Sequence, residues 1–134
     1  MTRRLAVELR TAGGTRAIDL GRDGDGTWRL DGEPIEGLDG ALDCDLGRCP
    51  LTNTMPVLRH GLDRRPGRHE FTMAWVSVPD LRVQRSEQVY AFAGRAGGQA
   101  RVDYEGRHRG YAGQLRFGPD GLVELYPGLG RRIA

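Results

Sequence analysis

Two neighbouring segments give the clearest indication of the fold: Ala100-Arg101-Val102-Asp103-Tyr104-Glu105 and Tyr111-Ala112-Gly113-Gln114-Leu115-Arg116-Phe117. A glycine-bounded turn at 106–110 joins them. In the first segment, apolar side chains alternate strictly with charged ones. Successive side chains of a strand point to opposite faces, so this alternation predicts a strand with one buried face. Two such segments around a turn predict an antiparallel hairpin.

The same alternation recurs on both sides of this hairpin. The further predicted strands cover residues 4–10, 17–20, 27–30, 41–46, 71–76, 81–92 as one long or two broken strands, and 122–126. Turn signals such as Asp23-Gly24-Asp25-Gly26 and Pro119-Asp120-Gly121 separate them. About nine strands at this spacing predict a mainly β fold, with a strongly curved antiparallel sheet or an open barrel.

One segment departs from the strand rhythm. Thr52-Asn53-Thr54 precedes Pro56, and Gly61 follows a short apolar run. Thr or Asn before a proline in the first turn, with glycine just past the end, is typical of a short helix. We therefore predict one helix over 54–60, with capping of its first turn as one role for Asn53.

Composition limits the function classes. The chain has 134 residues, 21 of them glycine, which predicts a single domain over 1–134 with few helices. All 20 basic residues are arginine, against 18 acidic residues, so enzymes that depend on a P-loop or Schiff-base lysine are excluded. The charges are interleaved rather than gathered in a basic stripe, which argues against nucleic acid as a partner.

The start of the chain leads directly into alternating residues, and no apolar run reaches the roughly 18 residues that a membrane span needs. We therefore expect a cytoplasmic protein without stable membrane insertion. Cys44 and Cys49 lack the further ligands of a zinc site, and His60, His69 and His108 are scattered beside arginines, which is typical of surface positions. We expect buried thiols, no metal and no cofactor.

Several motifs together resemble the putative glycolipid-binding family of bacterial cytoplasmic proteins. They are, in order, Leu42-Asp43-Cys44-Asp45-Leu46, Pro50-Leu51-Thr52-Asn53-Thr54-Met55-Pro56, Gln88-Val89-Tyr90, Asp120-Gly121-Leu122-Val123, and Tyr126-Pro127-Gly128-Leu129 with Arg131-Arg132. The Thr-Asn-Thr-x-Pro core is the most specific of them. The chain departs from the family where a second arginine usually follows Arg59, and where Asp usually stands before Tyr126.

The resemblance implies a spiral β-roll wrapped around one helix, with a lipid or glycolipid as ligand. Its motifs give the predicted ligand-binding residues, which are Asp43, Asp45, Thr52, Asn53, Thr54, Arg59, Gln88, Tyr90 and Tyr126. Asn53 can donate and accept hydrogen bonds, and Arg59 can pair with a phosphate or carboxylate. The expected function is binding of an amphiphilic small molecule in an apolar interior with a polar mouth.

The interior itself has two interpretations. The side chains predicted to line it are Trp28, Met73, Trp75, Tyr90, Phe92, Tyr104 and Phe117. They form either an ordinary core or a cavity for an acyl chain. If they form an ordinary core, the protein is a structural or interaction module without ligand. If they form a cavity, the protein is a carrier.

An enzyme is the other alternative. Asp43 and Asp45 share one strand face at a Cβ separation of about 7 Å, which suits acid-base or metal chemistry, although solvated aspartates are the more common outcome. With Arg59 they suggest a hydrolase or isomerase. No nucleophile motif supports catalysis, so we expect no catalytic residues and a binding protein rather than an enzyme.

Members of the family carry further strands before the point where this sequence begins. The segment from Arg4 to Arg10 would then lack a neighbour and expose its backbone along one sheet edge. Exposed edges favour pairing with another chain, while the arginines oppose it. We therefore expect a homodimer that forms through this N-terminal edge strand.

Overall fold

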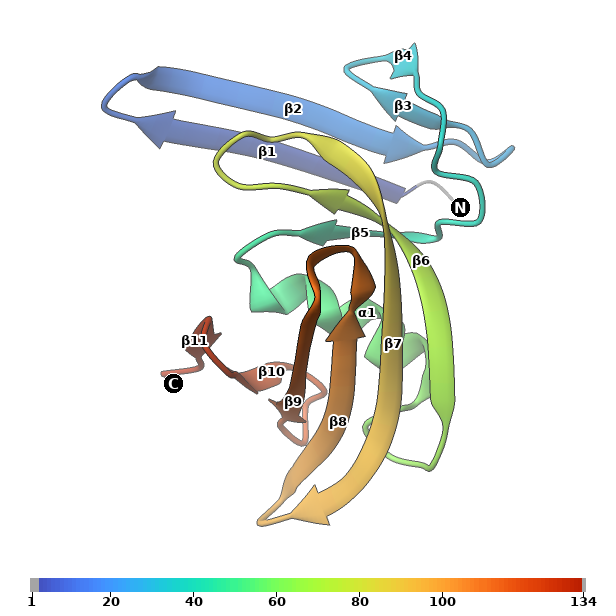
Figure 1. Ribbon diagram of the computed structural model, residues 1–134, viewed down its shortest axis with the longest axis vertical. Coiled ribbons are helices and arrows are strands. Elements are labelled where there is room, and N and C mark those ends of the chain that lie inside the picture. The colour runs from blue at the N-terminus through green and yellow to red at the C-terminus, as the bar shows by residue number, and fades with distance from the viewer. Residues whose placement is uncertain (1–2, 134) are drawn as a thin grey trace. The chain divides into compact units, whose positions relative to one another are not determined.

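The computed structural model describes residues 3–133 (Figure 1). The contacts within the chain divide it into two compact units. The first unit consists of residues 1–47 and 72–85, and the second of residues 48–71 and 86–134. Each is described by itself below.

The first unit contains a four-stranded antiparallel sheet in the order β1-β2-β3-β4 (Figure 1). Its strands are β1 (Arg3–Thr11), β2 (Gly14–Arg22), β3 (Trp28–Leu30) and β4 (Glu33–Pro34). At the predicted turn between β2 and β3, the Asp23 amide donates to the Thr27 carbonyl at 2.9 Å, and Gly26 has φ +93°. A left-handed φ of this kind costs glycine little, so the sequence closes the hairpin here.

The core of the first unit forms between this sheet and the next two strands. Its buried members are Leu20, Trp28, Leu38, Ala41, Cys44, Ala74, Val76 and Leu81. The Trp28 indole donates to the Ala41 carbonyl at 3.2 Å, which satisfies its one polar atom inside the core. The apolar face of β1, predicted from alternation, packs against this core through Leu5, Val7 and Leu9.

Strands β5 (Asp43–Leu46) and β6 (Arg68–Val76) pair in parallel, with Asp43 opposite Met73 and Leu46 opposite Val76. The sheet is therefore mixed rather than purely antiparallel. Parallel neighbours need a crossover connection, and the helical segment between these two strands supplies it. From β6 the same sheet continues through β7 (Val83–Ala96), β8 (Gln99–Gly106), β9 (Tyr111–Phe117) and β10 (Val123–Tyr126) to β11 (Gly130–Arg131).

The second unit contains the helical segment and most of the C-terminal half of the chain. Its elements are η1 (Pro50–Asn53), α1 (Thr54–His60), β7 (Val83–Ala96, from Ser86 on), β8 (Gln99–Gly106), η2 (Arg107–Arg109), β9 (Tyr111–Phe117), β10 (Val123–Tyr126) and β11 (Gly130–Arg131). Strands β7, β8, β9 and β10 are antiparallel neighbours and curve visibly (Figure 1).

Helix α1 occupies the predicted residues 54–60, and Gly61 ends it in the left-handed conformation, with φ 64°. Val57 and Leu62 are buried against Tyr90, Tyr104, Leu115 and Phe117 of the curved strands. The predicted fold class, a mainly β protein with a curved sheet around one short helix, is confirmed.

The strand predicted over 81–92 differs from the observed one. Strand β7 continues through Gly94 to Ala96, and the turn that follows is confined to Gly97 and Gly98. The register of β7 and β8 shifts between Phe92 and Arg95, and Gly94 has φ +105°. Glycine at such a bulge lets a strand bend without ending, which sequence alternation alone cannot reveal.

Strand β1 stands at the end of the four-strand order, consistent with the edge position expected of it. A homodimer through this edge and a single functional domain over 1–134 stay predictions.

Candidate functional site

A continuous chain of hydrogen bonds runs through the second unit. The Asn53 amide donates to the Tyr90 hydroxyl at 2.9 Å, and this hydroxyl donates to Gln88 Oε1 at 3.0 Å. The Gln88 amide donates to Ser86 Oγ at 3.1 Å, and Ser86 Oγ lies 2.6 Å from His108 Nδ1. Asn53, Ser86, Gln88 and Tyr90 are all buried. Three of the predicted ligand-binding residues therefore meet in one network.

The network has a direction. Asn53 donates to Tyr90, Tyr90 to Gln88 and Gln88 to Ser86, and Ser86 Oγ pairs with His108 Nδ1 at 2.6 Å. Which of these last two atoms donates depends on the tautomer of His108. Buried polar chains of this kind stabilise a fold when each member is satisfied. Ser86 and His108 were not predicted, since nothing local in their sequence marks a partner 22 residues away.

Asn53 does not cap α1. It occupies the position before the helix, but no side-chain hydrogen bond caps the first turn, and the amide reaches Tyr90 instead. The expected capping role is therefore wrong. Its neighbours are also buried: Thr52 Oγ1 donates to the Cys49 carbonyl at 2.9 Å, and Thr54 is 6% exposed. The buried Thr-Asn-Thr core thus anchors the start of α1 through the hydrogen bonds of Thr52 and Asn53.

All four tyrosines of the chain belong to one aromatic cluster in this unit. The rings of Tyr90 and Tyr104 meet edge to face at 5.0 Å, and Tyr126 lies 5.9 Å from Tyr104 and 5.3 Å from Tyr111. Arg109 donates to the Tyr126 hydroxyl and lies 4.8 Å from the centre of the Tyr111 ring. Tyr126, a predicted ligand-binding residue, is buried in this cluster.

The interior of the second unit is a packed core at these positions. Tyr90 and Phe117 are fully buried, and Tyr104 is 2% exposed. Trp28, Met73 and Trp75, predicted to line the same interior, belong to the first unit, and Trp28 is part of its separate core. Trp28, Met73, Tyr90, Tyr104 and Phe117 are therefore buried side chains, whereas Trp75 and Phe92 are half-buried.

The other predicted site residues are divided between the two units. Asp43 and Asp45 lie on β5 of the first unit, 1% and 4% exposed, whereas the neighbouring Leu42 is 44% exposed. The more common outcome for such aspartates, a solvated face, is therefore wrong here. Arg59 lies in the last turn of α1, in the second unit.

An open groove of about 350 Å³ lies beside the Thr-Asn-Thr segment. We call it the apolar groove; its lining residues are Pro50, Leu51, Leu122, Val123, Glu124, Leu129, Gly130, Arg131 and Arg132. Leu51 is 61% exposed and Leu129 is 36% exposed. The sequence prediction missed this site, although Leu122 and Leu129 stand inside the motifs that carry the family resemblance.

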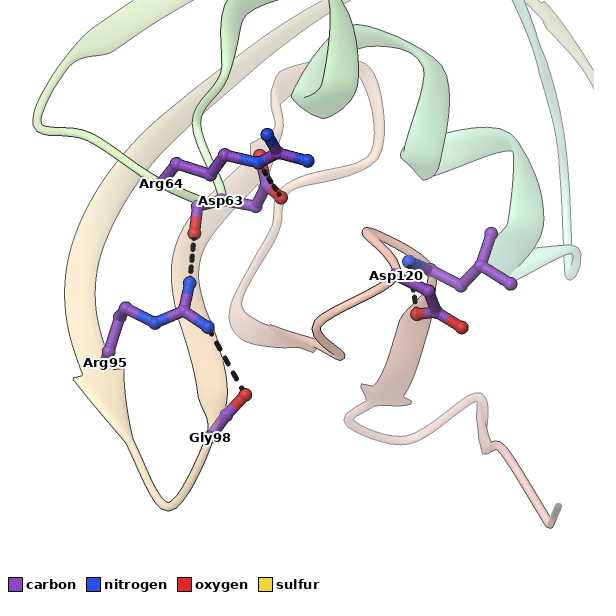
Figure 2. Close-up of polar contacts among 6 residues, drawn as sticks. Asp63, Arg64, Arg95, Gly98 and Asp120 are labelled. Carbon is purple, nitrogen blue, oxygen red and sulfur yellow. Dashed lines mark hydrogen bonds and ion pairs between the residues drawn. The ribbon is translucent and has the colours of Figure 1, made fainter.

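Hydrogen bonds hold in place the part of the groove that is formed by residues 122–132. The Leu129 amide donates to the Tyr126 carbonyl at 3.0 Å, and the Tyr111 hydroxyl donates to the Pro127 carbonyl at 2.9 Å. Asp120 accepts from the Leu122 amide at 3.1 Å and pairs with Arg132 at 2.6 Å. Figure 2 draws the hydrogen bond that the Asp120 carboxylate accepts from the Leu122 amide. The groove is therefore formed by anchored segments.

The network predicts a dependence of stability on pH. Burial, and then the charge of Arg109, lowers the pKa of His108 below its ordinary 6.5. At His108 the folded protein thus binds fewer protons than the unfolded chain. The stability that the neutral His108 contributes to the fold is therefore complete above pH 6.5, and it is lost as the pH falls through the lower pKa of the folded state. We expect the melting temperature to fall less below pH 6.5 in His108→Gln than in the wild type. Parallel curves would contradict the assignment.

The described residues bear on two kinds of partner, metal ions and membranes. Among residues 3–133, no group of three or more His, Cys, Asp or Glu side chains is arranged to hold a metal ion. In the same range, none of the helices combines the length and the hydropathy that a membrane crossing requires.

Comparisons with known proteins agree with the fold. No curated protein matches the chain. The crystal structure of a DUF1089 family protein from Pseudomonas aeruginosa superposes with a TM-score of 0.81 at 31% sequence identity, over 98% of this chain and 70% of that one. The model of the family described as putative glycolipid-binding matches residues 1–132. The chain therefore belongs to the putative glycolipid-binding family.

Proposed function

We propose that this protein binds an amphiphilic small molecule of the glycolipid class, and that the apolar groove receives the alkyl part of the ligand. The family description points to this ligand class. The single observation that carries the location is the pair of exposed leucines, Leu51 and Leu129, that both line this one groove. Ligand sites are typically apolar concavities of at least about 300 Å³ with a few polar groups, and this groove has that size.

The polar groups at the groove suit the other part of an amphiphile. Arg131 and Arg132 line it together with Glu124. Guanidinium and carboxylate groups at an apolar site can pair with hydroxyl or phosphate groups of a ligand. Such an arrangement replaces the polar mouth that was predicted around an interior cavity.

The buried network supports this function indirectly. Asn53 ties the start of α1 to β7 through Tyr90, and Leu51 stands two residues before Asn53. A groove wall anchored in this way loses less conformational entropy on binding than a mobile loop would. In this proposal Thr52, Asn53, Thr54, Gln88 and Tyr90 position the site rather than touch the ligand.

Binding can be tested with octyl glucoside, a short glycolipid, titrated below its micelle concentration and followed by isothermal calorimetry. Burying a leucine side chain contributes about 1.5 to 3 kcal/mol, so Leu51→Ser is expected to weaken binding about ten-fold or more. Because Leu51 is mostly exposed, the melting temperature of the Leu51→Ser variant should stay near that of the wild type.

Leu42→Ser is the matched control, since Leu42 is a similarly exposed leucine of the first unit. The proposal expects unchanged affinity in this variant. Equal losses in both variants, or no binding by the wild type, would contradict it.

A further inference from the structure

Beyond the end of α1, the chain forms a second, polar pocket of about 420 Å³. Its lining residues are Leu58, Arg59, Gly61, Asp63, Arg64 and Arg65, and we call it the arginine pocket. The left-handed Gly61 reverses the chain, and its carbonyl accepts from the amides of Arg64 and Arg65 at 3.1 and 3.2 Å. This turn brings three guanidinium side chains and one carboxylate to the same concavity.

Asp63 is the unusual member of this pocket. It is 3% exposed, and its Oδ1 atom has no hydrogen-bond partner. Oδ2 has only a long contact, 3.4 Å, with Nε of Arg64, whose side chain is 73% exposed (Figure 2). An incompletely paired buried carboxylate costs folding free energy, so its presence calls for a partner that binds from outside.

The backbone of Asp63 is, by contrast, firmly held. Arg95 on β7 donates to the Asp63 carbonyl at 2.7 Å and also contacts the Gly98 carbonyl at 3.4 Å (Figure 2). Leu62, the preceding residue, is 1% exposed in the core. The carboxylate is therefore presented from a fixed position, whereas Arg64 above it extends into solvent.

The guanidinium of Arg65 lies against the turn. A Cβ atom on Gly61 would stand 2.9 Å from Arg65 Nε, so glycine leaves the space that this side chain occupies. Three of the lining side chains, those of Arg59, Arg64 and Arg65, are cationic, and Asp63 is the acidic one among them. The pocket therefore attracts an anionic group while keeping one acceptor for hydroxyl donors.

We propose that the arginine pocket binds an acidic sugar, in which a phosphate or carboxylate pairs with the arginines and neighbouring hydroxyls donate to Asp63. A simple anion would use only the arginines and be repelled by Asp63, and a neutral sugar could accept from the arginines through its hydroxyls but would not form charge-assisted ion pairs with them. This assignment rests on the proposed function and narrows it, since it places an acidic headgroup in the arginine pocket rather than at Arg131 and Arg132 of the groove.

The two sites are linked along the helical segment. Met55 and Leu58 are exposed three residues apart on α1, as on one helix face, and the exposed Leu51 precedes them on η1. Leu58 lines the arginine pocket, and a Cβ on Gly121, next to Leu122 of the apolar groove, would collide with Leu58 Cδ2. An amphiphile can thus lie along one apolar stripe with its headgroup at the arginines.

The test uses glucose 6-phosphate, glucuronate and inorganic phosphate as soluble probes in calorimetry with the full chain. We expect both sugar acids to bind at least about ten-fold more tightly than phosphate, and Asp63→Asn and Arg65→Ala each to weaken them about ten-fold. Arg68→Ala, an exposed arginine outside the pocket, is the control and should change nothing. Asp63→Asn should melt at the same temperature as the wild type or higher, because it removes a buried charge.

Equal affinity for phosphate and the sugar acids, or unchanged sugar-acid affinity in Asp63→Asn, would overturn the proposal. Vesicles that contain glucuronosyl diacylglycerol, compared with vesicles of the neutral glucosyl lipid, identify the source of the sugar. Preference for the acidic vesicles supports a headgroup, and binding of soluble probes alone assigns the pocket to a free sugar acid. Because the soluble probes have no alkyl chain, they test this pocket even if octyl glucoside fails to bind the groove.

Discussion

Tyr90→Ala is expected to lower the free energy of unfolding by about 3 to 5 kcal/mol, the largest effect of any substitution proposed for this protein. Tyr90 is fully buried, and its ring packs edge to face on Tyr104 at 5.0 Å and on Phe71 at 5.7 Å. Removal of the ring leaves a cavity at the centre of the second unit and also breaks the hydrogen-bond network.

Tyr90→Phe separates these two contributions. It keeps the ring and removes the hydroxyl, which leaves the Asn53 amide without its acceptor and Gln88 Oε1 without its donor. We expect a loss of about 1 to 2 kcal/mol, measured by urea unfolding at pH 7. Equal effects of the two substitutions would show that the hydroxyl, and not the packing, dominates at this position.

Gln88→Leu is expected to cost about 2 to 4 kcal/mol. The substitution is nearly isosteric, so it creates little cavity, but it removes both the acceptor of the Tyr90 hydroxyl and a donor to Ser86. Each buried polar group left without a partner costs about 1 to 3 kcal/mol. Gln88 is 1% exposed, so water cannot replace these partners without rearrangement.

Gln114→Leu provides a matched control on the neighbouring strand β9. Its amide makes one hydrogen bond to Asp103, at 3.0 Å, in an exposed position. We expect a change within about 0.5 kcal/mol, as for most surface substitutions. If Gln88→Leu were as stable as this control, the buried network would not contribute to the fold.

Features set by short-range chemistry were predictable from the sequence. The helix over 54–60 follows from Pro56 and Gly61, whose backbone preferences act locally, and the structure has it at these residues. The hairpin of β8 and β9 likewise follows from strict alternation around a glycine-bounded turn. In both cases neighbouring residues alone decide the conformation.

Features that depend on distant partners were not predictable. Asn53 stands where a cap is expected, yet Tyr90, 37 residues later, takes its amide. A solvated position was the more common expectation for Asp43 and Asp45, but they are buried on the short strand β5. Arg64 and Arg65 had no predicted role, because the burial of Asp63 beside them is a property of the folded unit.

In the proposed function, an amphiphile binds in the apolar groove and leaves the aromatic core intact. Methyl NMR of the leucines during an octyl glucoside titration distinguishes the groove from the interior. We predict that the methyl signals of Leu51, Leu122 and Leu129 shift together and saturate, while those of Leu20 in the first-unit core and Leu115 in the second-unit core stay unchanged. Shifts of Leu115 with no change at Leu51 would place the ligand in the interior and contradict the proposed function.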